Sequence, residues 1–449
     1  SLIDDARQDI EIERSAFDLV FTSEGLVSER VQPVASSALD GALQPESASE
    51  RVASGVSKRF ATGATISVRS TLVDRGKTNS SFARLNPEYN SQLSLNLRQP
   101  LLKNRGKAAN LEAIRQAGLG ERRANIEVLA ELNTVLLRTE QAYWTLVATV
   151  AAEEIRRNAL ELAGLLTEEA EERRKVNLAT PVDVLEAKSA ASTKLEALLI
   201  SQNATKDAAD VLFREMGILE AVEPGALVLE PLPESAVDHP DADESFKRAI
   251  GQAPEMMVLR NVLNARELAL AQARRERYPQ LDFTFSTGVM GRGNTQGASL
   301  DQLQDRNGNF WQVGLELRLP WGFRLERARV VKARGAVQRS LLNLRDVELQ
   351  LLADIREAAR SITLAGERVE VAKVTVELNT LRFEQQQEER KEGEATMRDL
   401  LEAQEEMEAA ELRVIQAKVD LLRSTVALAQ LEGALPGRYG IGLEGGTSR

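Results

Sequence analysis

Two stretches of the chain, 172–187 and 388–403, repeat one another without a gap, and charged residues recur at matching positions in both. Each stretch carries an aspartate followed three residues later by a glutamate. These carboxylates are Asp183 and Glu186 in the first stretch, and Asp399 and Glu402 in the second. From the residues alone, each aspartate has a sufficient explanation as a residue that starts a helix, and each glutamate as a solvated side chain.

Basic residues precede the carboxylates in both stretches. They are Arg174 and Lys175 in the first copy, and Arg390 and Lys391 in the second. Positive charge near the C-terminus of a helix is favoured by the helix dipole alone.

Each stretch is predicted to be the tip of a helical hairpin. Asn177 and Gly393 can adopt the left-handed conformation that ends a helix. Thr180 and Thr396 then act as N-caps, with an aspartate three residues on in place of the usual Glu or Gln. Pro181 takes the first helical position, where its missing N–H is harmless. Two hairpins related in this way indicate an internally duplicated chain.

Composition narrows the function. The net charge of -11 over 449 residues argues against nucleic acid as a partner, and the chain has no cysteine. Metal-ligand clusters, a glycine-rich phosphate loop and a nucleophile elbow are all missing from the sequence. The only histidine, His239, stands beside a proline and is predicted to lie at the surface. We therefore expect no enzyme, no metal site and no cofactor.

Long helices must position the tips. Residues 101–176 and 321–392 lack an internal proline, and apolar residues recur in them every three or four positions. A shorter helix follows each tip, at about 181–217 and 397–433. Helices of this length cannot be buried in one globule, so we expect them to pack as coiled coils.

Short alternating segments precede each long helix. Strands are predicted at about 17–23, 52–60, 64–72, 93–100, 281–287 and 311–320. Residues 24–50 and 291–309 are predicted to be loops. The hairpin within 51–73 has no counterpart in the second copy, and we expect it in or beside the sheet. One face of these strands is apolar, as in a membrane barrel or in a soluble sheet with one wet face.

A membrane barrel would have to be shared between chains. One chain offers four repeat-matched strands, or six with the inserted hairpin, whereas the smallest barrels need about eight. Open sheet edges cannot face lipid. No run of about 18 apolar residues occurs, so no transmembrane helix is predicted.

The expected organisation follows the duplication. The segments are 1–100 (the end of a leading helix and the first strands, with the hairpin at 51–73), 101–217 (first helical hairpin, tip 174–187), 218–243 (connector), 244–278 (second leading helix), 279–320 (second strands), 321–433 (second helical hairpin, tip 390–403) and 434–449 (tail).

The order of these motifs resembles the TolC-like outer-membrane efflux proteins. A strand ending at 97–102, a long helix, the motif at 179–187 and a second helix all occur twice, over almost the whole chain. The resemblance implies a mainly α protein with membrane β: a homotrimer in which long coiled-coil hairpins form an α-barrel tunnel and the strands share one β-barrel. It implies an outer-membrane location with a large periplasmic part. It also implies a periplasmic adaptor, an inner-membrane transporter and outer-membrane lipid as partners.

The resemblance also assigns roles at the tips. Asp399 and Glu402 match the acidic constriction of the family, and Asp183 matches an aspartate that tethers neighbouring hairpins. The arginine expected as its partner is replaced by Ala395, and the tyrosine position is Arg390. We therefore hypothesise an Arg390–Asp183 tether. Candidate gate residues are Asp399, Glu402, Asp183, Glu186 and Arg390, and candidate docking residues are Arg174, Lys175, Asn177, Thr180, Pro181, Lys391, Gly393 and Thr396.

One alternative is a soluble or periplasmic coiled-coil scaffold or adaptor without a membrane barrel. An adaptor would normally show one helical hairpin between small β domains, not two hairpins with alternating strands. A soluble scaffold would not need the strands.

Overall fold

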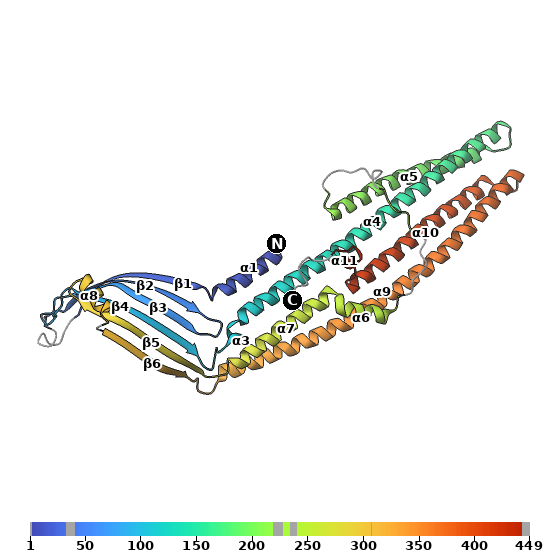
Figure 1. Ribbon diagram of the computed structural model, residues 1–449. Coiled ribbons are helices and arrows are strands. Elements are labelled where there is room, and N and C mark those ends of the chain that lie inside the picture. Colours follow the sequence, from blue (N-terminus) through green and yellow to red (C-terminus); the bar gives the residue numbers. More distant parts are fainter. Residues whose placement is uncertain (1, 33–40, 219–227, 234–239, 307, 442–449) are drawn as a thin grey trace. The chain divides into compact units, whose positions relative to one another are not determined.

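The computed structural model divides the chain into two compact units, one of residues 1–124 and 261–342 and the other of 125–260 and 343–449. It describes residues 2–32, 41–218, 228–233, 240–306 and 308–441. Most of the predicted connector, with His239, lies outside the described residues. Figure 1 labels the helices and strands of both units. The predicted combination of long helices with an antiparallel sheet is confirmed.

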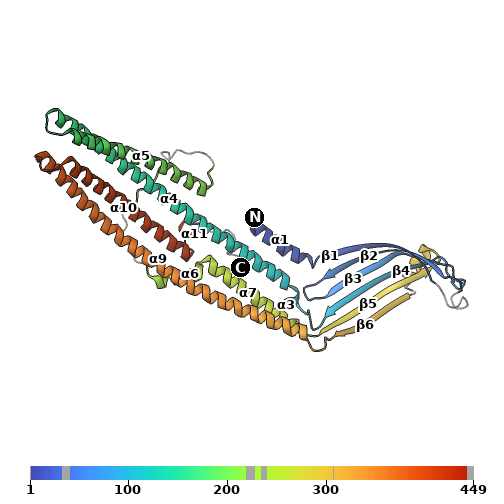
Figure 2. The ribbon, with the colours of Figure 1, turned by 180° about the vertical axis from the view of Figure 1, so that it is seen from behind.

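The first unit contains a sheet of six antiparallel strands in the order β1-β2-β3-β4-β5-β6, also seen from behind in Figure 2. The strands are β1 (Leu19–Val31), β2 (Glu46–Arg59), β3 (Thr65–Thr78), β4 (Glu88–Pro100), β5 (Gln280–Gly293) and β6 (Gly308–Arg318). β1 and β6 are its edge strands. The sheet therefore ends on two strands that each pair on one side only.

The register gives this sheet an apolar face and a polar face. Cross-strand partners have side chains on the same face, so one pairing such as Leu97↔Phe285↔Val313 fixes the face of every alternate residue. The apolar face carries Phe21, Val56, Ile66, Val68, Leu93, Leu95, Leu97, Phe283, Phe285, Trp311, Val313, Leu315 and Leu317. Many of these side chains are exposed, including Phe21 and Leu315 at 68% each.

Hydrogen bonds and ion pairs cross the polar face. Arg98 Nε donates to Asp282 at 3.1 Å, and Asp282 is buried. Ser286 donates to Asn96 over 2.8 Å, and Arg69 lies 3.4 Å from Glu24. These contacts satisfy the polar groups of neighbouring strands without involving the apolar face.

The prediction of a loop over residues 24–50 was wrong at both ends. β1 continues to Val31 and β2 already begins at Glu46, because the two strands pair along their whole lengths. The inserted hairpin of 51–73 belongs to the sheet between β1 and β4. Its turn needs Gly63 (φ 91°), where a Cβ would lie 2.6 Å from the carbonyl oxygen of Asn104.

The prediction of a loop over residues 291–309 was wrong as well. Residues Gln296–Gln304 form α8, which starts at Thr295, whose side chain accepts a hydrogen bond from the Ala298 N–H. α8 packs on β5 and β4. Thr295 is a favourable N-cap residue, so the start of this helix has a signal in the sequence.

The second leading helix, predicted as one piece over 244–278, is broken. α6 (Ala242–Gln252) and α7 (Pro254–Arg275) meet at Ala253, whose ψ of 125° is extended. The ring of Pro254 disfavours the helical conformation of the preceding residue, which explains the break. The N-terminal part of α9 packs on α7 through Leu270, Val330 and Val337 in the first unit.

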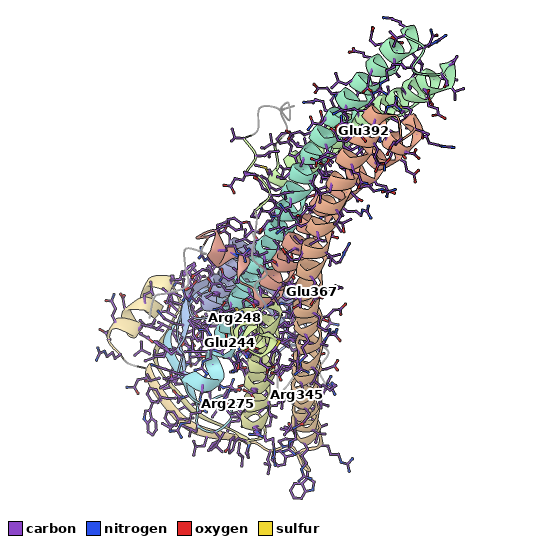
Figure 3. All side chains as sticks on the ribbon, turned by 90° about the vertical axis from the view of Figure 1, so that its right-hand side faces the viewer. Glu244, Arg248, Arg275, Arg345, Glu367 and Glu392 are labelled. Carbon is purple, nitrogen blue, oxygen red and sulfur yellow. The ribbon has the colours of Figure 1, made fainter. Side chains whose placement is uncertain are left out.

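The remaining helices differ in length. α1 (Leu2–Ser15) and α3 (Lys107–Asn110) are short, whereas α4 (Glu112–Lys175), α5 (Pro181–Met216), α9 (Arg324–Glu392) and α10 (Met397–Glu432) make the two hairpins, and α11 (Leu435–Arg438) follows. Around Ile355, fully buried residues of α6, α7, α9 and α10 form the largest core cluster of the second unit. Arg248 on α6, labelled in Figure 3, pairs with Glu432 on α10 at 2.7 Å. No helix in the described part of the chain is both long and apolar enough to cross a membrane.

Candidate functional site

The two predicted tips have the same backbone geometry. Asn177 (φ 59°) and Gly393 (φ 86°) are left-handed, as expected. In the first tip the N–H of Asn177 donates to Arg174 O, and the N–H of Leu178 donates to Arg173 O. The same pair of bonds closes α9 after Glu392, which Figure 3 labels. Both long helices therefore end in a Schellman motif.

A capping box opens each following helix. Asp183 accepts hydrogen bonds from the N–H and hydroxyl of Thr180, at 2.7 and 2.9 Å. Asp399 accepts the same two bonds from Thr396, at 2.9 and 2.6 Å. The Thr396 hydroxyl and N–H hold the pKa of Asp399 below its usual range. The N-cap prediction is confirmed, and Pro181 lies at the first helical position.

Matching ion pairs lie before each turn. Lys175 Nζ is 2.6 Å from Glu172, and Lys391 Nζ is 2.6 Å from Glu388. These side chains are exposed, so each pair adds little stability. Both lysines nevertheless keep a positive charge at the outer end of their helices.

A shared apolar cluster joins the two tips. It contains Leu166, Ala170, Val184, Ala187, Phe383, Met397, Leu400 and Ala403, from α4, α5, α9 and α10. Leu400 and Met397 have no exposed surface. Arg173 of the first tip also donates to the carbonyl of Arg390 at 3.2 Å. The structure therefore brings the two repeated stretches into one packed assembly.

Arg390 differs from its equivalent in the first tip. Arg174 is exposed, whereas Arg390 is only 6% exposed and its Nε has no hydrogen-bond partner. Burial lowers the pKa of Arg390, and Glu169, Arg173 and Asp183 are the charges that act on it. The structure records no ion pair between Arg390 and Asp183 among the described residues, and Asp183 accepts hydrogen bonds from Thr180. The Arg390–Asp183 tether stays a prediction.

The two candidate glutamates lie beyond the caps. Glu402 is exposed and Glu186 is half-buried. Neither makes a hydrogen bond or ion pair with another described residue, so their carboxylates are available to water or to other molecules. One chain supplies a few such groups, and a ring requires several copies.

Sequence reasoning missed a buried ion pair between the hairpins. Lys194 of α5 and Glu408 of α10 are 2.6 Å apart, and their side chains are 10% and 11% exposed. Burial and the neighbouring Glu408 raise the pKa of Glu411. A usable signal existed, because Lys194 stands seven residues after Ala187 and seven before Ser201, which are both buried.

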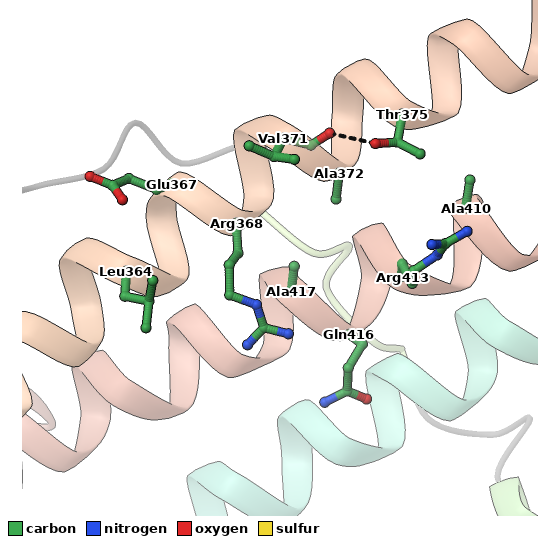
Figure 4. A pocket seen from close by; sticks show the side chains of 10 residues that line it. All are labelled: Leu364, Glu367, Arg368, Val371, Ala372, Thr375, Ala410, Arg413, Gln416 and Ala417. Atoms are coloured by element: carbon green, nitrogen blue, oxygen red, sulfur yellow. Dashed lines mark hydrogen bonds between the residues drawn. The ribbon is translucent and has the colours of Figure 1, made fainter.

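A groove with a volume of about 440 Å³ runs between α9 and α10, shown from close by in Figure 4. Leu364, Val371 and Ala417 give it an apolar surface, and Arg368 and Arg413 border it. In the described part of the chain, no group of three or more His, Asp or Glu side chains could hold a metal ion.

A protein-family model matches within the second half of the chain. Residues 246–434 match the family model described as outer membrane efflux protein. The match covers less than half of the chain. The predicted resemblance is thus confirmed, and with it the expectation of a channel-type protein rather than an enzyme. No curated protein sequence matches the chain.

The fold is that of solved outer-membrane channels. The chain is similar to CmeC from Campylobacter jejuni (15% identity, 96% of this chain and 81% of that chain, TM-score 0.63). It is also similar to VceC from Vibrio cholerae (17% identity, 96% of this chain and 90% of that chain, TM-score 0.64). A third similar structure is the open state of MtrE from Neisseria gonorrhoeae (13% identity, 96% of this chain and 84% of that chain, TM-score 0.65). At these identities the likeness shows the fold alone. Together with the efflux family match, it agrees with an outer-membrane location and does not favour a soluble scaffold.

Proposed function

We propose that three copies of the chain form an outer-membrane channel that conducts substrates received from a periplasmic adaptor and an inner-membrane transporter. The observation that carries the proposal is the open six-stranded sheet with one apolar and one polar face. A sheet in lipid cannot leave its edges unpaired, because each unsatisfied backbone group costs several kcal/mol. Closing the sheet with other copies removes the edges.

The strand count suits such closure. β1 and β6 are separated by an even number of strands, so they run antiparallel to each other. When β6 of one copy pairs with β1 of the next, the seam continues the antiparallel pattern. The apolar face then contacts lipid, and the polar face with Glu24, Arg69 and Asn96 lines the lumen.

The helices also present surfaces that another copy can cover. On α9, Leu364, Val371 and Leu378 repeat every seven residues and are 58%, 67% and 61% exposed. On α5, Leu185 and Leu199 show a similar exposure. Apolar heptads of this kind are typical of coiled-coil seams. We infer that neighbouring copies pack here, so that the duplicated hairpins together form a tunnel.

The tips would act as gate and docking site. Glu402, Glu186 and the capped Asp399 and Asp183 supply carboxylates, which would select cations if the copies bring them to one constriction. Asp183 has a second role open to it: released from Thr180, it could pair with Arg390. The candidate docking residues of both tips are exposed and suit contact with an adaptor. They are Arg174, Lys175, Asn177, Thr180, Pro181, Lys391, Gly393 and Thr396.

The first test is the mass of the protein part after purification from membranes in mild detergent, measured by light scattering. We expect three chains that need detergent to remain dispersed. A monomer or dimer that is soluble in plain buffer would leave the apolar face without lipid and would support the scaffold alternative. The detergent-free fraction of the same preparation serves as the control.

A further inference from the structure

α8 lies on the apolar face of the sheet, not on the polar one. Ser91 and Ser299 are both buried and their hydroxyls are 2.6 Å apart. The register of β4 with β5 is unbroken from Tyr89 to Pro100, so Ser91 shares its face with Leu93 and Leu95. The helix is therefore seated on the side that the proposed function turns towards lipid.

Two glycines make room for this seat. A Cβ on Gly291 would lie 2.0 Å from the carbonyl oxygen of Ser299, and one on Gly293 would lie 2.8 Å from Ala298. Both glycines belong to the same face as Val289, two residues before Gly291. Gln296 also donates to the carbonyl of Leu72, which ties α8 across β3, β4 and β5.

The helix begins where the apolar band ends. On β5 the band runs from Leu281 to Val289, nine residues, or about 30 Å along the strand. At a tilt of about 40° this is a height of about 23 Å, close to the band of about 25 Å in outer-membrane barrels. Tyr278 and Trp321, 59% and 97% exposed, border the other end next to α7 and α9.

The composition of α8 suits an interface. Leu300 is 42% exposed on a helix whose other exposed side chains include Asp301, Gln302 and Gln304. A short helix with an apolar contact and polar neighbours can lie in the plane of a membrane surface. Buried within a pore, the same Leu300 would face water.

We propose that α8 is an interfacial helix on the lipid side of the sheet, in contact with the headgroups of the outer leaflet, and that it fixes the depth of the sheet in the bilayer. The proposal rests on the proposed function, because it needs the apolar face to be in lipid. It adds a second boundary opposite Tyr278 and Trp321. The partner is the lipid surface itself.

The chain lacks cysteine, so single-cysteine variants report one site each. Leu300→Cys probes α8, while Leu315→Cys and Gln312→Cys probe the apolar and polar faces of β6. Each is labelled with a small fluorophore in full-length protein and reconstituted in phosphatidylcholine vesicles. Quenching is compared for a nitroxide at the headgroup, a nitroxide deep in the acyl chain, and iodide in the water.

We expect the label at position 300 to be quenched most by the headgroup nitroxide, that at 315 most by the deep nitroxide, and that at 312 by iodide alone. If the label at 300 follows the label at 312, α8 lies on the pore side and the proposal is overturned. If the label at 315 also escapes both nitroxides, the apolar face is not in lipid and the proposed function itself fails. The two failures are thus distinguished by position 315.

Discussion

A buried ion pair, Lys194–Glu408, connects α5 to α10. Two charges in such a place attract one another strongly, but both have lost much of their hydration. The pair therefore matters most when one partner is removed. Glu411 places a second carboxyl group near Glu408 on α10.

Lys194→Met alone is expected to lower the free energy of unfolding by about 3–5 kcal/mol, because it leaves the Glu408 carboxylate buried without a partner. Lys194→Met with Glu408→Met is expected to recover most of that loss. Urea unfolding of the detergent-solubilised protein, followed by circular dichroism, measures both. Equal losses in the single and the double variant would mean that the side chains contribute by packing and not by charge.

The structural roles of some residues could be predicted from the sequence, and those of others could not. The caps at Thr180 and Thr396 are decided by residues within one helical turn, so they could be predicted. Lys194 and Glu408 are 214 positions apart, and only the packing of the two hairpins makes them partners. The burial of Arg390 and the exposure of Arg174 likewise depend on which side of the tip faces the shared cluster.

At the scale of elements, the sheet separates an apolar face from a polar face. Edge strand β6 carries Val313 on the apolar face and Gln312 on the polar face, one residue apart. Both are exposed in the single chain. The two positions therefore lie on the same strand, and their side chains lie on opposite faces of the sheet.

Val313→Arg is expected to destabilise the assembled protein by about 2–4 kcal/mol, because arginine on the lipid side of a barrel is costly near the middle of the bilayer. Gln312→Arg is expected to have little effect, since it faces the polar side. Urea titration of protein folded into vesicles, read by the shift of its mobility in gels, compares the two. A similar loss for both variants would argue against a lipid-facing apolar side.

The boundaries of helices and strands could be predicted where a periodic apolar pattern continues over many residues. The hairpin helices have C-terminal ends within a residue or two of the predicted limits, because apolar spacing and turn residues agree there. The start of the first one was predicted wrongly: α4 begins at Glu112 and not near residue 101. β1 and β2 were predicted too short, because hydrogen bonds between strands extend both beyond the alternating residues. The break at Ala253 was signalled by Pro254, but the continuous apolar pattern on both sides obscured it.

At the scale of the whole molecule, the acidic tips predict ion selectivity. Asp399→Asn with Glu402→Gln removes two charges per chain, while the Asn side chain can still accept the hydrogen bond from the Thr396 N–H. We expect the reversal potential under a salt gradient in planar bilayers to move towards zero, because fewer carboxylates would attract cations. Blocking by multivalent cations should weaken in parallel.

The matched control removes two charges elsewhere. Asp5→Asn with Asp9→Asn alters exposed residues of α1, in the first unit, and changes the net charge equally. Selectivity should stay at the unaltered level in this variant. Should the tip variant and the control behave alike, the acidic constriction would be removed from the proposal and the carboxylates at the tips would be helix caps and solvated side chains only.

The six strands of one chain also determine how wide a shared barrel would be. Three copies would supply eighteen strands. With strands about 4.8 Å apart and tilted by about 40°, such a barrel is about 36 Å across between backbones, against about 24 Å for one of twelve strands. A barrel of this girth is as wide as a general porin and leaves an aqueous passage unless side chains or loops occupy it. The membrane segment would then offer little resistance to diffusing solutes, and the rate of export would be limited within the helices.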